Sequence, residues 1–349
     1  MYKRQTISSA DQRLDTSNRP IIDLLANWLD AQGFSINIQP VTGNGHAEKA
    51  NLIATIGSGE GGLVLAGHTD TVPYDDTQWV SDPFAVTERD NCFFGLGTTD
   101  MKGFFAVVLE ALKSVELDKL NKPLIILATA DEESSMAGAR ALSKSDFGQA
   151  RYAIVGEPTG LKPIHLHKGV MMESIRLEGR SGHSSNPALG NSALDAMYHV
   201  IGALMELRQE WGIQYQNPAF DIEVPTMNLA KIHGGDATNR ICRHCALEFD
   251  VRLLPGMNSE DTRHSIRQCV DQVLLESGIS ASYASLFDGA EAFNQERDAD
   301  LIQTVEKMTG ETAGNVAYAT EAPFLQALGM QTVVLGPGSI DCAHQANEY

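Results

Sequence analysis

Short apolar segments that each end in a polar cluster recur along this chain, and they constrain its fold more than any other feature. Four of them have the sequences GGLVLAGHTDTVP, PLIILATADEE, ARYAIVGEPTG and MQTVVLGPGSIDCAHQ, at residues 61–73, 123–133, 150–160 and 330–345. Because helix-like stretches separate these short continuous strands, they predict a mostly parallel α/β sheet flanked by helices. Open sheets of this kind bind ligands outside the carboxyl ends of their strands, where the polar clusters fall.

The helix-like stretches are recognised by the spacing of their apolar side chains. Residues 18–34 are expected to form a helix that ends at Gly33, and a second helix is expected from about Met101. The first helix carries one apolar stripe, which consists of Ile21, Leu24, Leu25, Trp28 and Leu29.

The pattern of apolar and polar residues changes in the middle of the chain, which indicates an inserted domain. Residues 168–283 read as strand, helix, strand, strand and helix, with alternating apolar residues in the strands. We therefore expect a smaller α+β domain at 168–283, inserted into a larger catalytic domain that is formed by residues 1–167 and 284–349.

Composition excludes several classes of function. The 349 residues carry a formal net charge of −19, which opposes binding to nucleic acid or to an anionic membrane surface. No apolar run reaches the length of a membrane span, and the first residues have no apolar signal-peptide core, so a cytoplasmic protein is expected. The five cysteines are scattered and do not suggest a disulfide framework. Cys242 and Cys245 are interpreted as strand residues, with a structural zinc or redox role as the alternative.

The polar residues at the strand ends form a set that suits a metal site. Each has an ordinary explanation by itself: adjacent acids such as Glu132 and Glu133 suit a solvated loop or a first helical turn, and Asp100 suits a helix N-cap. Together they offer imidazole nitrogens and carboxylate oxygens, as zinc, cobalt or manganese sites do. The acids outnumber what one zinc ion needs, and two ions bridged by a carboxylate would use them. The set comprises His68, Asp70, Asp100, Glu132, Glu133, Glu157 and His344.

Six motifs together resemble a known family. GHTDTVP, GLGTTDMKG, DEESSMAGAR, GEPT, SGHSSNP and AHQ stand in the order and rough spacing of the dinuclear-zinc aminoacylase and carboxypeptidase family. Within it, HTDTVPYDD, ATADEESSMAGAR, HGGDATNRIC and LGPGSI are most similar to the acetylornithine deacetylase branch. The resemblance implies a zinc-peptidase-like catalytic domain with an inserted dimerisation or lid domain. It also implies two divalent metal ions (zinc or cobalt), a homodimer, and hydrolysis of a small N-acyl amino acid.

The resemblance also implies a role for each metal-site residue. His68 and Glu157 would bind one ion, Glu133 and His344 would bind the other, and Asp100 would bridge the two. Glu132 would act as the general base. Asp70 would support the imidazole of His68, which fits its place two residues further along an extended segment.

Three residues of the inserted domain are implied to bind substrate. His183 would reach across a dimer interface, and its alternative is an ordinary loop histidine. Asn239 and Arg252 would grip the substrate carboxylate, which suits the fork of an arginine. The alternative for Arg252 is an exposed strand residue in a surface salt bridge.

Two departures from the family and two rival functions remain open. Relatives begin with a further helix and continue past the position of Tyr349, so a truncated sequence is expected, with its activity in doubt. The substrate could instead be another N-acyl amino acid, such as acetylcitrulline or succinyl-diaminopimelate. A non-catalytic protein with the same fold is the second rival, and it should lack a ligand or the base.

Overall fold

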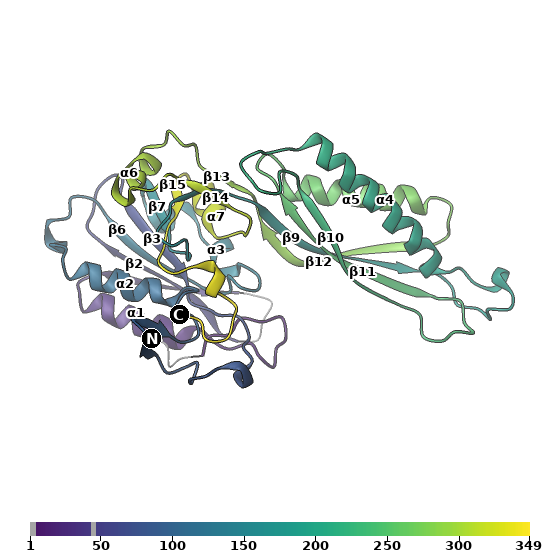
Figure 1. Ribbon diagram of the computed structural model, residues 1–349, viewed down its shortest axis with the longest axis horizontal. Coiled ribbons are helices and arrows are strands. Elements are labelled where there is room, and N and C mark those ends of the chain that lie inside the picture. The colour runs from purple at the N-terminus through teal and green to yellow at the C-terminus, as the bar shows by residue number, and fades with distance from the viewer. Residues whose placement is uncertain (1–4, 43–46) are drawn as a thin grey trace. The chain divides into compact units, whose positions relative to one another are not determined.

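A computed structural model describes residues 5–42 and 47–349, and the chain divides into two compact units (Figure 1). The larger unit comprises the chain up to Leu166 together with Asn294–Asn315 and Thr320–Tyr349, and the smaller unit comprises His167–Phe293 and Val316–Ala319. Within the described ranges, no helix combines the length and the apolar composition that a membrane crossing requires.

The larger unit is built on a nine-stranded sheet, whose central strands confirm the expected mostly parallel arrangement. The strand order is β1-β2-β6-β3-β7-β15-β8-β13, with β14 paired to β8. Strands β6, β3, β7 and β15 are parallel to one another, whereas β1, β2 and β8 join antiparallel. The bounds are β1 Ser35–Val41, β2 Lys49–Ile56, β3 Leu63–His68, β6 Leu124–Thr129, β7 Tyr152–Val155, β8 Ile164–His167, β13 Phe293–Asn294, β14 Gly314–Val316 and β15 Gln331–Val334.

Helices cover this sheet because each buries one apolar stripe. Helices α1 (Arg19–Asp30) and α2 (Lys102–Leu112) pack through Leu25 and Phe105 against Leu52 and Ile126 of the sheet. The N-terminal stripe was expected to include Trp28, but this side chain is 41% exposed, and Ile22 is buried in the same helix. The remaining elements of this unit are α3 Ala137–Arg140, α6 Asp300–Thr309, α7 Ala322–Ala327 and the hairpin of β4 Thr87–Arg89 and β5 Cys92–Phe94.

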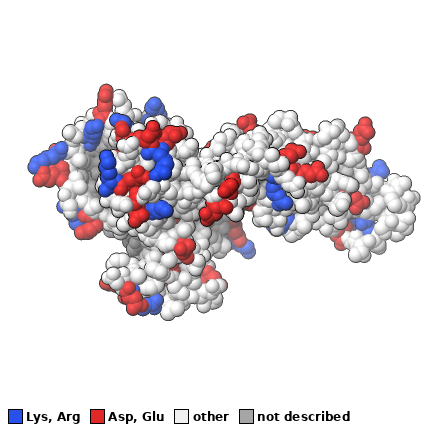
Figure 2. Space-filling view, turned by 45° about the horizontal axis from the view of Figure 1, so that its top comes forward, with Lys and Arg blue, Asp and Glu red and all other residues white. Residues whose placement is uncertain are grey.

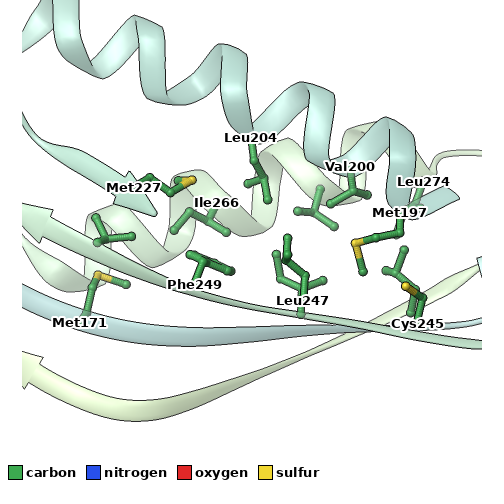
Figure 3. Packing of buried hydrophobic residues seen from close by; sticks show 14 of the residues in the cluster. Met171, Met197, Val200, Leu204, Met227, Cys245, Leu247, Phe249, Ile266 and Leu274 are labelled. Carbon is green, nitrogen blue, oxygen red and sulfur yellow. The ribbon is translucent and has the colours of Figure 1, made fainter. Parts of the chain in front are cut away.

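The smaller unit is an antiparallel sheet with two helices packed on it. Its strands follow the order β10-β11-β9-β12, and Figure 3 shows part of the core between sheet and helices, with Leu204 of α4 and Ile266 of α5 facing Phe249 of β11. Alternate residues of β11 are buried, as a sheet with one covered face requires. The bounds are β9 Gly169–Glu178, α4 Ala193–Gln214, β10 Thr226–Gly234, β11 His244–Leu253, α5 Ser259–Leu274 and β12 Ser280–Ala290.

Two sequence interpretations are refined by this unit. The return to the larger unit was expected at Ala284, but that residue lies inside β12, where it pairs with Ser174 of β9, and the larger unit resumes at Asn294. Cys245 lies in β11 with its side chain in the core, as interpreted, but Cys242 lies before β11 begins at His244, so its interpretation as a strand residue is wrong. In the part of the chain that the structure describes, the groups able to hold a metal contain no cysteine.

Surface charge follows the acidic composition. On the face shown in Figure 2, acidic side chains lie among the basic ones over both units.

Candidate metal centre

The carboxyl ends of the central strands bring six of the candidate residues together. Three overlapping groups have ligand atoms within 4.8 Å of one another. All belong to the larger unit. His68 ends β3, Asp100 lies just before α2, and the others follow β6, β7 or β15, which is where an open parallel sheet places a ligand. The groups are His68 with Asp100 and Glu157, His68 with Glu132 and Glu133, and Asp100 with Glu133 and His344.

His68 is held with one ring nitrogen toward the other ligands. Its Nδ1 lies 3.1 Å from the backbone carbonyl of Asp70, and its Nε2 lies 2.9 Å from Oδ1 of Asp100 and 3.8 Å from Oε1 of Glu157. An Nδ1–H donated to that carbonyl leaves the Nε2 lone pair facing the carboxylates, which is the orientation a metal-binding imidazole needs.

The carboxylate of Asp70 has a different main role from the expected one. Its Oδ1 is 3.6 Å from His68 Nδ1, beyond hydrogen-bond distance. Its two oxygens instead accept hydrogen bonds from the backbone N–H groups of Glu132, at 3.2 Å, and Glu133, at 3.0 Å. Asp70 therefore supports the imidazole through its carbonyl group and fixes the two glutamates through its side chain.

The three consecutive acids after β6 divide into one structural residue and two site residues. Asp131 adopts a left-handed conformation with φ 58°, and its carboxylate turns back to Lys49, at 2.7 Å, and to the hydroxyl of Ser8, at 2.8 Å. Glu132 and Glu133 face the site. The ordinary explanation of a solvated loop is thus wrong for these acids, because all three are engaged within the protein.

Lys49 provides the positive charge that balances the carboxylate of Asp131 in this turn. Its side chain is 2% exposed, and its Nζ lies 2.8 Å from Asp15 Oδ1 and 2.7 Å from Asp131 Oδ1. Burial disfavours the ammonium ion, but the hydrogen bonds to Asp131 and Asp15 outweigh this effect and raise the pKa of Lys49 above its ordinary value. A charged lysine therefore joins two acids that would otherwise repel each other.

Replacing Lys49 by methionine is expected to lower the free energy of unfolding by about 3–5 kcal/mol, because it leaves two buried carboxylates without a counter-charge. Urea unfolding of wild type and variant measures this loss. Lys113→Met is the control, because Lys113 forms an exposed pair with Glu110 and its loss should have little effect. Equal midpoints for Lys49→Met and wild type would contradict the structural role of the pair.

Asp100 belongs both to the group that contains His68 and to the group that contains His344. Its Oδ1 faces His68 and its Oδ2 lies 3.3 Å from Nε2 of His344. The N-cap position of α2 is occupied by Met101, so the alternative of Asp100 as the helix cap is wrong. His344 also lies 3.1 Å from Glu133, and its side chain is 54% exposed. One carboxylate therefore has an oxygen directed to each imidazole.

Burial and the closeness of the acids to one another raise the pKa values of three carboxyl groups in this cluster. Burial raises the pKa of Glu133 to about 7, and it raises the pKa values of Glu132 and Glu157 well above their ordinary range. Hydrogen bonds to Asp100 and Glu133 raise the pKa of His344 to about 10. Carboxylates gathered at this density become stable as anions when cations lie among them.

The donor set fits a pair of divalent cations. Two imidazoles and three carboxylates lie in the two groups that share Asp100, and nitrogen and oxygen donors suit zinc or cobalt. The positive charge of two such ions would offset the negative charge of these carboxylates.

Two buried glutamates near the site were not identified from the sequence. Glu321 accepts a hydrogen bond from the hydroxyl of Thr129, and burial raises its pKa to about 7. Glu348 accepts hydrogen bonds from the loop that ends at Asp100. Neither follows an apolar strand, so the strand-end pattern could not indicate them.

The candidate substrate residues lie in the smaller unit, in two separate places. His183 and Asn239 are exposed on adjacent loops, which are joined by the bridge from His183 to Arg240 and by the hydrogen bond from Ser184 N–H to the Asn239 carbonyl. Arg252 lies near the other end of β11, roughly 25 Å from His244 at the rise of an extended strand. Its guanidinium group pairs with Asp250 at 3.0 Å.

Comparison with known proteins agrees with this geometry. A family model described as peptidase family M20/M25/M40 matches residues 64–349. Acetylornithine deacetylase from Edwardsiella ictaluri is 49% identical over 344 residues, which are 99% of this chain and 89% of that protein, and the enzyme of the same name from Klebsiella pneumoniae is 48% identical with the same coverage.

Solved structures of the family have the same fold. An M20 family metallo-carboxypeptidase from Sulfolobus solfataricus has a TM-score of 0.74 at 17% identity, covering 99% of this chain and 92% of that one. A dinuclear metal binding peptidase of the M20 family from Bacillus subtilis has a TM-score of 0.62 at 13% identity, covering 96% of this chain and 85% of that one. These matches confirm the resemblance, and the chain belongs to peptidase family M20/M25/M40.

Proposed function

We propose that this protein hydrolyses the acetyl amide of N2-acetyl-L-ornithine to L-ornithine and acetate, a reaction of arginine biosynthesis. The observation that carries the proposal is the cluster of two imidazoles and four carboxylates at the strand ends, in a chain 49% identical to an acetylornithine deacetylase over 99% of its length. The family supports metal-dependent hydrolysis of an amide, and the similarity of this relative supports the particular substrate.

The proposed reaction uses two divalent metal ions, zinc or cobalt. His68, Asp100 and Glu157 would hold one ion, and Asp100, Glu133 and His344 would hold the other. Bound at these donors, such ions lower the pKa of water toward neutrality and stabilise negative charge on the oxygen of the acyl group.

Glu132 is the proposed general base. It lies in one group with His68 and Glu133, and Asp70 fixes its backbone N–H. Its carboxylate would take a proton from the attacking water and later give it to the departing nitrogen of ornithine.

A homodimer is proposed because the candidate substrate residues are divided. His183 and Asn239 lie on loops at one end of the smaller unit, while Arg252 lies toward the other end of β11. One small amino acid cannot contact both places in a single copy. The proposal therefore assigns the His183–Asn239 loops of one copy and Arg252 of the other to the same substrate.

Turnover of three substrates tests the specific proposal. We expect kcat/KM for acetylornithine to exceed the values for acetylcitrulline and succinyl-diaminopimelate by at least about tenfold, and chelation of metal to abolish all turnover. An acidic protein with a formal charge of −19 disfavours the additional carboxylates of succinyl-diaminopimelate. Equal turnover of the three would contradict the substrate, and no turnover by metal-loaded protein would favour the non-catalytic alternative.

A further inference from the structure

The last residues of the described chain are bound to the loop that carries Asp100. Glu348 is 2% exposed, and its Oε1 accepts hydrogen bonds from the backbone N–H groups of Thr99, at 2.8 Å, and Asp100, at 2.9 Å. Its Oε2 accepts a third from Gly97 N–H at 2.9 Å, and its backbone carbonyl accepts one from Gly95 N–H at 3.0 Å. A single residue therefore satisfies four backbone donors of one loop.

The hydrogen bonds to Glu348 are strong enough to fix the conformation of this loop. Both carboxylate oxygens accept, and hydrogen bonds to an ionised acceptor are about twice as strong as neutral ones. The three N–H groups that bind the side chain would lose their partner if the carboxylate were removed, and buried donors without a partner are costly. The loop conformation that presents Asp100 thus depends on the side chain of Glu348.

Glu348 is also close in sequence to His344, another candidate metal ligand. His344 lies four positions before Glu348 in the segment AHQANEY. Asn347 anchors this segment separately, because its side chain accepts from Val80 N–H at 2.8 Å and donates to the carbonyl of Gln78 at 3.3 Å. Glu348 is the residue of the segment whose side chain binds the backbone of Asp100.

We propose that Glu348 is a positioning residue that fixes the positions of Asp100 and His344 relative to each other. It is required for binding the ion at Asp100, Glu133 and His344. The proposal rests on the proposed pair of metal ions. The group of His68, Asp100 and Glu157 should depend on it less, because His68 is fixed by β3 and contacts Asp100 directly at 2.9 Å. Loss of Glu348 should therefore affect the two ions unequally.

The test measures metal binding without substrate. Wild type, Glu348→Gln, Glu348→Ala and Asn347→Ala are stripped of metal and titrated with zinc against a competing chelator, and circular dichroism confirms that each is folded. We expect two binding steps in wild type. In Glu348→Gln, the affinity of one step should fall about 10- to 100-fold, as happens when the supporting partner of a ligand is removed, and the other step should change little.

The other variants separate positioning from general stability. Asn347→Ala removes an anchor of the same segment but leaves the three N–H bonds, so both steps should resemble those of wild type. Glu348→Ala should lose the same step that Glu348→Gln weakens; if it does not fold, Glu348→Gln decides, because it preserves the volume of the side chain. Wild-type affinities in Glu348→Gln, or an equal loss of both steps, would overturn the proposal. A wild type that binds fewer than two ions would instead contradict the proposed metal pair.

Discussion

Replacement of Glu132 by glutamine is expected to lower kcat at least ~100-fold while the bound metal stays unchanged. Glutamine has nearly the same shape but cannot accept and release a proton at the reacting water, and positioned acid–base groups contribute about 10²–10⁴-fold. Glu132 belongs to the cluster around His68, but it lies outside the two groups that share Asp100. Its loss should therefore affect proton transfer more than metal binding. Steady-state kinetics together with metal analysis of the same samples measures both effects.

The neighbouring residue supplies the matched control. Glu133→Gln removes the same charge one position along the chain, but Glu133 lies 3.1 Å from His344 and belongs to the group with Asp100. We expect this variant to lose metal as well as activity. Near-normal turnover of Glu132→Gln would remove Glu132 from the mechanism, and loss of metal from it would assign Glu132 to binding instead.

Replacement of Asp100 by asparagine is expected to have the largest effect on the metal centre. Asp100 is shared by the groups of His68 and His344, and its two oxygens face different imidazoles. Its loss should weaken both ions, whereas His344→Asn should weaken one. Because metal stabilisation of the reacting charges contributes several kcal/mol, we expect kcat/KM to fall roughly 1000-fold or more.

Metal analysis after exhaustive dialysis measures this effect together with the rate. Asp118→Asn, a change at an exposed acid, controls for the loss of one negative charge from the protein. If Asp100→Asn retained two ions per chain, Asp100 would not be the shared ligand.

The strand-end pattern was sufficient to predict the central sheet and to identify the six residues whose ligand atoms the structure brings together. His68 and Glu157 each end or follow an apolar strand, so their positions follow from the chain direction of β3 and β7. The roles of Asp131 and Lys49 could not be predicted in this way. They depend on a left-handed turn and on a pairing between residues far apart in the sequence. Local patterns indicate where a strand ends but not which distant side chain balances its charges.

The smaller unit shows a second limit of sequence interpretation. The segment SASYASLFDGA of β12 is rich in small polar residues, so its apolar alternation is weak; the strand was not predicted, and the expected domain boundary at Ala284 falls inside it. Its position is fixed by hydrogen bonds to β9, which hold polar residues as well as apolar ones in register. The side-chain role of Glu348 was missed for a related reason, because its partners are backbone groups of another loop.

The location of bound metal in crystals of the zinc-loaded protein tests whether two ions share Asp100. Anomalous diffraction measured on both sides of the zinc absorption edge should give two peaks per chain, both in contact with the carboxylate of Asp100. One peak should also contact His68 and Glu157, and the other Glu133 and His344. A single peak, or peaks that lie away from Asp100, would contradict the shared two-metal centre on which the proposed hydrolysis depends.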